Sequence, residues 1–299
     1  MRLITVLFVL EGVNLGFSAV CRKEFEETVC ENFTFTPETV LDSATNKILI
    51  KNAEGKIIHE HLSNLGLVQD IKITGSALSD IEPGALCCVP NITSFTFMDN
   101  RAIPKVTWKI FQDCQHLKKV NFDGSEVRVE NGAFADARDL QTLSLNESVL
   151  PDNIEKATFE GLTSLRSLTI RHSKFTRIKE DAFDDLKNLK FLDLQGNKIE
   201  TIAPNTFRGL LQLKVLNLSE NKLKNLTWSE FDGLKALRVL FLEHNDFNTV
   251  NVDKLVAGVP DLERIFFSYD KLTPESRKRV EETLPKFNIT FIYTGKPTD

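Results

Sequence analysis

The sequence has no excess of basic residues and no long apolar segment beyond its first residues. Its formal net charge is -5, so the chain as a whole has no attraction to nucleic acid or to an anionic membrane. No later run approaches the roughly 18 apolar residues that a membrane helix needs. The polar tail from Thr294 to Asp299 does not resemble a lipid-anchor signal. We therefore expect no membrane span and no nucleic-acid partner.

Catalytic motifs are also missing. The sequence contains no nucleophile elbow, phosphate-binding loop or CxxC pair. His59 and His61 could hold a metal in principle, but no acidic or cysteine ligand is placed beside them by the pattern. We therefore expect no enzyme, no cofactor and no metal site.

The N-terminus has the organisation of a signal peptide. Arg2 precedes an apolar run from Leu3 to Leu10, and small residues permit cleavage after Ser18 or Ala19. We predict a signal peptide over residues 1–18; the alternative is a buried N-terminal strand. N-glycosylation sequons occur at Asn32, Asn91, Asn146, Asn217, Asn225 and Asn288. Together with five cysteines, these features predict a secreted, extracellular glycoprotein.

A repeat dominates the rest of the chain. Its copies open at Ile92, Leu117, Leu140, Leu165, Leu189, Leu213, Leu237 and Leu262. The intervals are 25, 23, 25, 24, 24, 24 and 25 residues. The clearest copies read LKFLDLQGNKI from Leu189 and LKVLNLSENKL from Leu213. This pattern resembles the typical leucine-rich repeat of extracellular proteins, including Toll-type receptor ectodomains and secreted insect immune proteins.

Each repeat position has a physical role. Alternating apolar residues, such as Leu192 and Leu194, predict a short strand with one buried face. The asparagines that follow the strands are expected to hydrogen-bond backbone groups left unpaired at the turn. They are Asn100, Asn197, Asn221 and Asn245, whereas Ser76, Ser125, Ser148 and Ser173 occupy the same place in other coils. We expect looser turns where serine replaces asparagine.

Phenylalanine supplies a second regular feature. The chain has 22 Phe but only 2 Tyr and 2 Trp, a bias that indicates a repeated structural position. Six phenylalanines recur in the second half of successive coils: Phe111, Phe134, Phe159, Phe183, Phe207 and Phe231. We predict that these rings stack into a buried spine near the convex side of the array.

The predicted fold is an α/β solenoid, a right-handed leucine-rich-repeat horseshoe with a parallel concave sheet and about nine or ten repeats. We expect an N-terminal cap over residues 19–44, repeats over 45–272 and a C-terminal cap over 273–299. In that cap Thr273 and Pro274 predict a helix start. The helix is expected to end near Leu284, and residues 288–293 are expected to form an edge strand.

The cysteines fall into two groups. Cys21 and Cys30 resemble a reduced N-terminal cap of the family, which implies a disulfide between them. Cys114 lies one coil after Cys87 and Cys88 and can pair with either, and we favour Cys88 because it is closer in register. The remaining thiol, Cys87, would then either form a disulfide-linked dimer or stay buried and inert.

The concave face is the expected binding surface. Apolar and aromatic residues gather on it in the second half of the array, and our candidate partner site consists of Phe191, Val215, Val239, Phe241, His244, Arg264, Phe266 and Tyr269. The alternative is that these are half-buried strand residues covered in part by the C-terminal cap. A mixed-charge set is a second candidate: Lys119, Asp123, Glu147, Arg171 and His172.

The resemblance implies an extracellular recognition protein that binds a protein partner, or a microbial or glycan ligand, and it favours a role in innate immunity. The other interpretation is a component of the extracellular matrix or of cell adhesion. Fold alone does not decide between them.

Overall fold

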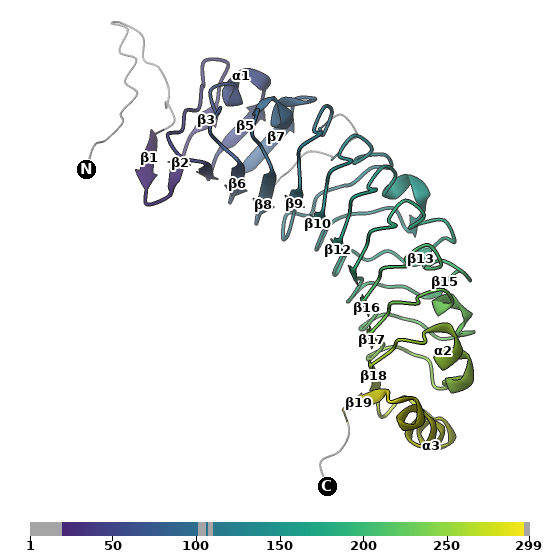
Figure 1. Ribbon diagram of the computed structural model, residues 1–299. Coiled ribbons are helices and arrows are strands. Elements are labelled where there is room, and N and C mark those ends of the chain that lie inside the picture. The colour runs from purple at the N-terminus through teal and green to yellow at the C-terminus, as the bar shows by residue number, and fades with distance from the viewer. Residues whose placement is uncertain (1–19, 101–105, 107–109, 296–299) are drawn as a thin grey trace, which may run out of the picture. The chain divides into compact units, whose positions relative to one another are not determined.

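The computed structural model describes residues 20–100, 106 and 110–295 (Figure 1). The predicted signal peptide, residues 1–18, lies outside the described residues. The chain divides into two compact units, residues 1–144 and residues 145–299, which we call unit 1 and unit 2. Among the described residues, no helix combines the length and apolarity required to cross a membrane.

Unit 1 is built on one long sheet. Its strands follow in the order β1 (Val20–Glu24), β2 (Glu27–Glu31), β4 (Lys47–Lys51), β6 (Asp70–Thr74), β8 (Ser94–Met98), β9 (Lys119–Asn121) and β10 (Thr142–Ser144). Only β1 and β2 are antiparallel, and every later neighbour is parallel. A second sheet contains β3 (Thr34–Phe35), β5 (Glu54–Ile57) and β7 (Ala77–Ile81). The connections include the helix α1 (His59–Leu62) and the 3₁₀ turn Ala85–Cys88.

Unit 2 repeats this plan with shorter strands. Its main sheet contains β12 (Ser167–Thr169), β14 (Phe191–Asp193), β16 (Val215–Asn217), β17 (Val239–Phe241), β18 (Arg264–Ser268) and β19 (Thr290–Thr294), all parallel. The small sheet contains β11 (Asn153–Ile154), β13 (Arg177–Ile178) and β15 (Thr201–Ile202). Two helices, α2 (Val252–Gly258) and α3 (Pro274–Thr283), and the 3₁₀ turns Lys156–Thr158, Ser229–Phe231 and Leu284–Phe287 complete the unit.

The asparagine turns of unit 2 form the predicted ladder. Asn221 Nδ2 donates to the carbonyls of Leu194 and Leu218 at 3.0 and 3.1 Å, and its Oδ1 accepts from the backbone N–H of Ile199. Asn197 and Asn245 make equivalent bonds to their own neighbouring coils. Each side chain therefore accepts from one buried backbone N–H, which would cost about 1–3 kcal/mol if left unpaired, and shares the neighbouring carbonyls with the next asparagine.

Serine replaces this bonding only in part, as expected. Ser173 Oγ donates to the Leu145 carbonyl and accepts from the Ser148 backbone N–H. The Ser148 hydroxyl itself is buried without a hydrogen-bond partner. The turn at Ser148 is therefore less completely bonded than the turns with asparagine, whereas the hydroxyls of Ser76 and Ser125 both donate and accept.

The six predicted phenylalanines are buried, each no more than 2% exposed. In unit 2, Phe159, Phe183, Phe207 and Phe231 stack in sequence with centroids 5.8–6.4 Å apart. In unit 1, Phe111 and Phe134 stack at 5.6 Å. The predicted spine is therefore confirmed within each unit.

Each end of the chain adds a strand to a sheet. At the N-terminal end, β1 and β2 form a hairpin joined by the disulfide Cys21–Cys30, the pairing that the family resemblance implied. At the other end, Thr273 Oγ1 accepts from the Ser276 N–H and caps α3. After α3 the chain returns as β19, which lies parallel to β18. Both helix and strand lie where the sequence placed them.

One cysteine assignment was wrong. Cys114 pairs with Cys87, at a Cα–Cα distance of 5.1 Å, and the free thiol is Cys88. Adjacent residues of a 3₁₀ turn point about 120° apart, so only one of the two can face the next coil. Cys88 Sγ instead contacts the carbonyls of Ala85 and His59.

This pairing also removes the predicted intermolecular bridge through Cys87. Burial raises the pKa of the remaining free thiol, Cys88, to about 11. A thiol with so high a pKa is rarely a thiolate at neutral pH, and the thiolate is the reactive form. Cys88 is therefore a poor candidate for forming the bridge in place of Cys87.

Candidate functional site

The open face of the unit 2 sheet presents two rows of outward side chains. The first row follows the register Phe191, Val215, Val239 and Arg264. The second follows Asp193, Asn217, Phe241, Phe266 and Ile292. The intervening Leu192, Leu216, Leu240 and Ile265 are fully buried on the opposite side. Period-two alternation therefore separates the core from this face.

The apolar members of these rows gather toward β17, β18 and β19. Phe241 and Phe266 stack with their ring centroids 4.4 Å apart and their planes 20° apart. Both rings remain partly exposed, and Ile292 beside Phe266 is 37% exposed. We call the following set the apolar surface: Phe191, Val215, Val239, Phe241, Phe266 and Ile292. A contiguous, partly exposed apolar group of this kind is typical of an interaction surface.

Six of the eight predicted site residues lie on the sheet face. They are Phe191, Val215, Val239, Phe241, Arg264 and Phe266. Val239 is buried, at 7% exposure, so it supports its neighbours more than it offers contact area. His244 is exposed at the turn after β17, where its backbone N–H donates to Ser268 Oγ. It lies beyond the strand and borders the apolar surface.

Tyr269 belongs to the terminal packing. Its ring meets Tyr293 edge to face at 5.2 Å, and the Arg277 guanidinium of α3 lies 4.3 Å from its centroid. Burial raises the pKa of Tyr293 to about 12. Tyr269 therefore helps to hold α3 and β19 against the sheet.

Charge borders the apolar surface along one side. Arg166, Lys190, Lys214 and Arg238 are exposed and immediately precede β12, β14, β16 and β17; we call them the basic row. Backbone hydrogen bonds of 2.9 Å link each to the next, from Lys190 N to Arg166 O and onward to Arg238 N. Only Arg238 has an ion-pair partner within the described chain, Glu263.

Sequence reasoning missed this row and Ile292. The row could have been found, since each member directly follows the first leucine of its repeat. Ile292 could not, because its place on the face depends on β19 joining β18.

One acidic group lies next to the aromatic pair. Glu243 follows β17, and its Oε2 atom is buried without a hydrogen-bond partner. Burial raises the pKa of this carboxyl, with its own backbone N–H and His244 acting in the opposite direction. A buried carboxylate oxygen without a donor is costly to keep charged.

The second candidate set contains at least one structural residue. Arg171 binds Asp193 Oδ2 through Nε and a terminal nitrogen at 2.9 and 2.5 Å, and Asp193 is 1% exposed. The pair neutralises a buried carboxylate, so Arg171 has a role within the fold. Glu147 and His172 are exposed at left-handed turn positions.

The histidine pair near α1 is not arranged as a metal site. His61 is 1% exposed; its Nδ1 accepts from the Ile58 N–H, and its Nε2 lies 2.8 Å from the Thr36 carbonyl. Both ring nitrogens are therefore committed to the backbone. Within the described residues, no cluster of three or more His, Cys, Asp or Glu side chains could hold a metal ion.

Comparison with known families identifies the repeat. Residues 41–151 match the BspA-type leucine-rich-repeat region, and residues 140–199 and 194–247 match the leucine-rich repeat. The chain therefore belongs to the leucine-rich-repeat family, and the predicted repeat solenoid with its parallel sheet is confirmed. No curated protein matches the chain in sequence.

Solved structures share the fold at low identity. The FLRT2 leucine-rich-repeat chain, from its octameric complex with latrophilin 3 and Unc5D, superposes with a TM-score of 0.68 at 18% identity. That match covers 93% of this chain and 92% of the other. TLR13, solved in complex with ssRNA13, gives a TM-score of 0.66 at 22% identity over 75% of this chain. Toll from Drosophila, solved in complex with Spatzle, gives 0.63 at 16% identity over 83%. This chain spans only 32% of the TLR13 chain and 35% of the Toll chain.

Proposed function

We propose that this chain is a secreted recognition protein that binds a protein partner through the apolar surface of unit 2. The observation that carries the proposal is the partly exposed Phe241–Phe266 stack on the open face of a parallel sheet. Aromatic anchors within a charged rim are the usual energetic centre of a protein interface. The basic row and Arg264 provide such a rim.

A protein partner is favoured over a glycan or nucleic acid by the chemistry of the face. Its centre is apolar, with Phe191, Val215 and Ile292 around the stacked rings, and its charges lie at the margin. Two of the similar structures are complexes with proteins, Toll with Spatzle and FLRT2 with latrophilin 3 and Unc5D. A role in innate immunity is our working hypothesis, supported by the Toll-type resemblance. Tyr269 is an indirect part of the proposed site because it supports β19.

The sequons bear on access to this face. Asn32, Asn91, Asn225 and Asn288 are exposed, as glycan acceptors need to be. Asn217 is half-buried on β16, its Oδ1 accepting from the Ser219 N–H and its Nδ2 donating to Gln195. A glycan at Asn217 would lie on the open face beside Phe241. We propose that the exposed sequons carry the glycans and that Asn217 does not.

Affinity capture from extracellular fluid tests the function. The wild-type chain is compared with Phe241→Ala and Phe266→Ala, and captured proteins are identified and then purified. We expect each variant to weaken binding of the purified partner by at least about 2 kcal/mol, or about 30-fold. Leu67→Ala is the matched control, because Leu67 is 65% exposed but lies in unit 1. Full binding by both phenylalanine variants would refute the proposal.

A further inference from the structure

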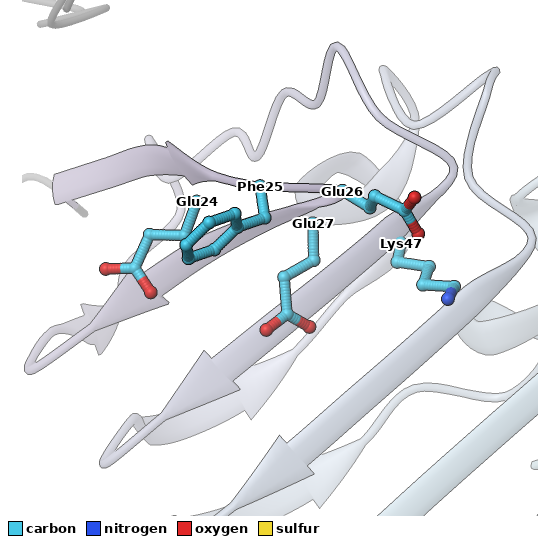
Figure 2. A pocket seen from close by; sticks show the side chains of 5 residues that line it. All are labelled: Glu24, Phe25, Glu26, Glu27 and Lys47. Atoms are coloured by element: carbon cyan, nitrogen blue, oxygen red, sulfur yellow. The ribbon is translucent and has the colours of Figure 1, made fainter.

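The turn between β1 and β2 presents an unusual side chain. Phe25 is 100% exposed, although most of the other phenylalanines of this protein are buried. It stands at the tip of the hairpin, between Glu24 and Glu27, which face each other across the turn. Figure 2 shows the ring among the glutamates of the turn, with Lys47 on the neighbouring strand β4.

The backbone at this tip is strained. Phe25 has a φ of 50°, in the left-handed region, and is the first of the two turn residues. Glycine is the usual residue there, because a side chain crowds the backbone. A bulky residue in this conformation is an outlier that carries a cost. The fold recovers none of that cost through packing, since the ring is fully exposed.

The tip is also acidic. Glu24 is paired with Arg22, at 2.6 Å, but Glu26 and Glu27 have no ion-pair partner in the described part of the chain. We call Glu24, Phe25, Glu26 and Glu27 the hairpin tip. It combines one exposed aromatic ring with uncompensated negative charge.

Unit 2 offers the complementary surface. Its stacked Phe241 and Phe266 are partly exposed, and the basic row runs along the margin. Lys190 and Lys214 are neighbours across the sheet, linked by a backbone hydrogen bond. Neither lysine has an ion-pair partner among the described residues. Like charges at neighbouring sheet positions destabilise a fold unless an anion relieves them. An exposed aromatic ring flanked by carboxylates matches this surface in two ways. The ring can pack against the stacked phenylalanines, and the carboxylates can pair with the two lysines.

We propose that the hairpin tip of one molecule docks on the apolar surface of a second copy of the chain. Phe25 packs against Phe241 and Phe266, and Glu26 and Glu27 approach Lys190 and Lys214. The inference builds on the proposed function, because it assigns an occupant to the same surface. The two surfaces differ, so the contact is head to tail and either closes into a ring or extends as a chain.

Analytical ultracentrifugation of the purified mature chain tests this association. We expect the wild type to associate with rising concentration, and more weakly at high salt, where charges are screened. Phe25→Gly should weaken association at least about 30-fold. Glycine suits the turn, so this variant keeps the hairpin. Leu67→Ser, at another exposed apolar side chain, is the control and should associate like the wild type.

A mixing experiment makes the test specific. Phe25→Gly retains the receiving surface, whereas Phe241→Ala retains the tip. Each variant alone should be largely monomeric, and their mixture should form a complex with one molecule of each. Lys214→Glu, at an exposed position, should weaken association without disturbing the core. It replaces Phe241→Ala in the mixture if that variant folds poorly.

Three outcomes would overturn the inference. They are a wild type that remains monomeric at every concentration, a Phe25→Gly variant that associates normally, and a mixture without a complex. The proposed function fails separately, when Phe241→Ala and Phe266→Ala still bind the captured partner. A monomeric wild type whose partner binding depends on Phe241 would leave the function standing and remove only the self-association.

Discussion

Unit 1 and unit 2 build the same repeat with different means. In unit 1 the strands β2, β4, β6 and β8 are five residues long. One disulfide there closes the β1–β2 hairpin and a second cross-links two neighbouring coils. In unit 2 most strands of the main sheet have three residues, and regular ladders of asparagine and phenylalanine connect the coils. The family comparison reflects this division, since residues 41–151 and 140–247 match different repeat models.

The difference shows two ways of holding neighbouring coils. A ladder needs the same side chain at the same place in every coil, so it tolerates little irregularity. A disulfide fixes two points and leaves the residues between them free to vary. The charges differ as well, because unit 2 has 23 acidic and 23 basic residues, and the net charge of -5 therefore lies in unit 1. The acidic hairpin tip belongs to unit 1, whereas the basic row belongs to unit 2.

Truncating the phenylalanine spine should produce the largest loss of stability. Phe183 is 2% exposed and stacks on Phe159 and Phe207. Phe183→Ala should lower the free energy of unfolding by about 3–5 kcal/mol. Chemical denaturation measures the loss, and hydrogen exchange should place it in unit 2. Phe25→Ala, which removes an exposed ring, should change stability by less than about 0.5 kcal/mol. Equal losses in both variants would rule out a special role for the spine.

Removing the second disulfide should weaken unit 1 selectively. Cys87 and Cys114 are 27 residues apart, for which loop-closure entropy predicts a stabilisation of about 3.5 kcal/mol. The double variant Cys87→Ser, Cys114→Ser should speed hydrogen exchange in unit 1 and leave unit 2 unchanged. Cys88→Ser is the control and should keep the cross-link by peptide mapping. A cross-link lost in that control would contradict the pairing.

Asparagine and serine at the same turn position should differ in how much they contribute to the free energy of unfolding. Asn221→Ala leaves the buried Ile199 N–H without its acceptor. It also removes one donor from each of the Leu194 and Leu218 carbonyls, which keep their bonds from Asn197 and Asn245. We expect a loss of about 1–3 kcal/mol. Ser148→Ala removes a hydroxyl that bonds nothing, and we expect a change below about 0.5 kcal/mol. Urea denaturation compares them. Similar losses at the two positions would show that the asparagine ladder is not what distinguishes these turns.

The smallest predicted effect is a pH dependence confined to unit 1. Burial lowers the pKa of His61, against weaker opposing contributions from the Thr36 carbonyl, Glu60 and Glu82. The neutral ring accepts the Ile58 N–H at Nδ1, and protonation of that nitrogen breaks the bond. The stability that His61 contributes is therefore complete above about pH 6.5, the ordinary value. It is lost as the pH falls toward the lowered pKa of the folded state, by at most about 1.4 kcal/mol per pH unit.

Unfolding measured between neutral and mildly acidic pH checks this dependence. His61→Gln should remove the slope in that window, because glutamine does not titrate. His59→Gln, at the exposed neighbouring histidine, should retain it. A slope that persists in His61→Gln would assign the pH dependence to another group.

Much of the fold follows from local pattern. Leucine spacing located the main-sheet strands from β8 to β18, asparagine located the turns, and Thr273 with Pro274 located the start of α3. These features are legible because each depends on residues close in sequence and recurs in every coil. The early coils were harder to read, and β2 was not expected to pair in parallel with β4. The irregular spacing of apolar residues there does not mark β2, which becomes a strand of the main sheet only through its pairing with β4.

The candidate site was only partly legible. Phe241 and Phe266 could be placed on one face because the repeat sets their register. Tyr269 follows the same pattern, yet α3 and β19 draw it into the terminal packing. Ile292 joins the apolar surface for the converse reason, because β19 adds to the sheet. The positions of Tyr269 and Ile292 both depend on pairing between segments that are distant in the sequence. A local sequence pattern does not reveal such pairing.

The sequence by itself determined the repeat, its buried leucines, its asparagine turns and its phenylalanine spine, since periodic burial requires periodic residues. Tertiary structure alone decided which of Cys87 and Cys88 meets Cys114, because a turn of the backbone sets the direction of adjacent side chains. It also decided that Phe25 is exposed at a strained turn while nearly every repeat phenylalanine is buried. A phenylalanine is therefore buried or exposed according to whether a neighbouring coil covers it.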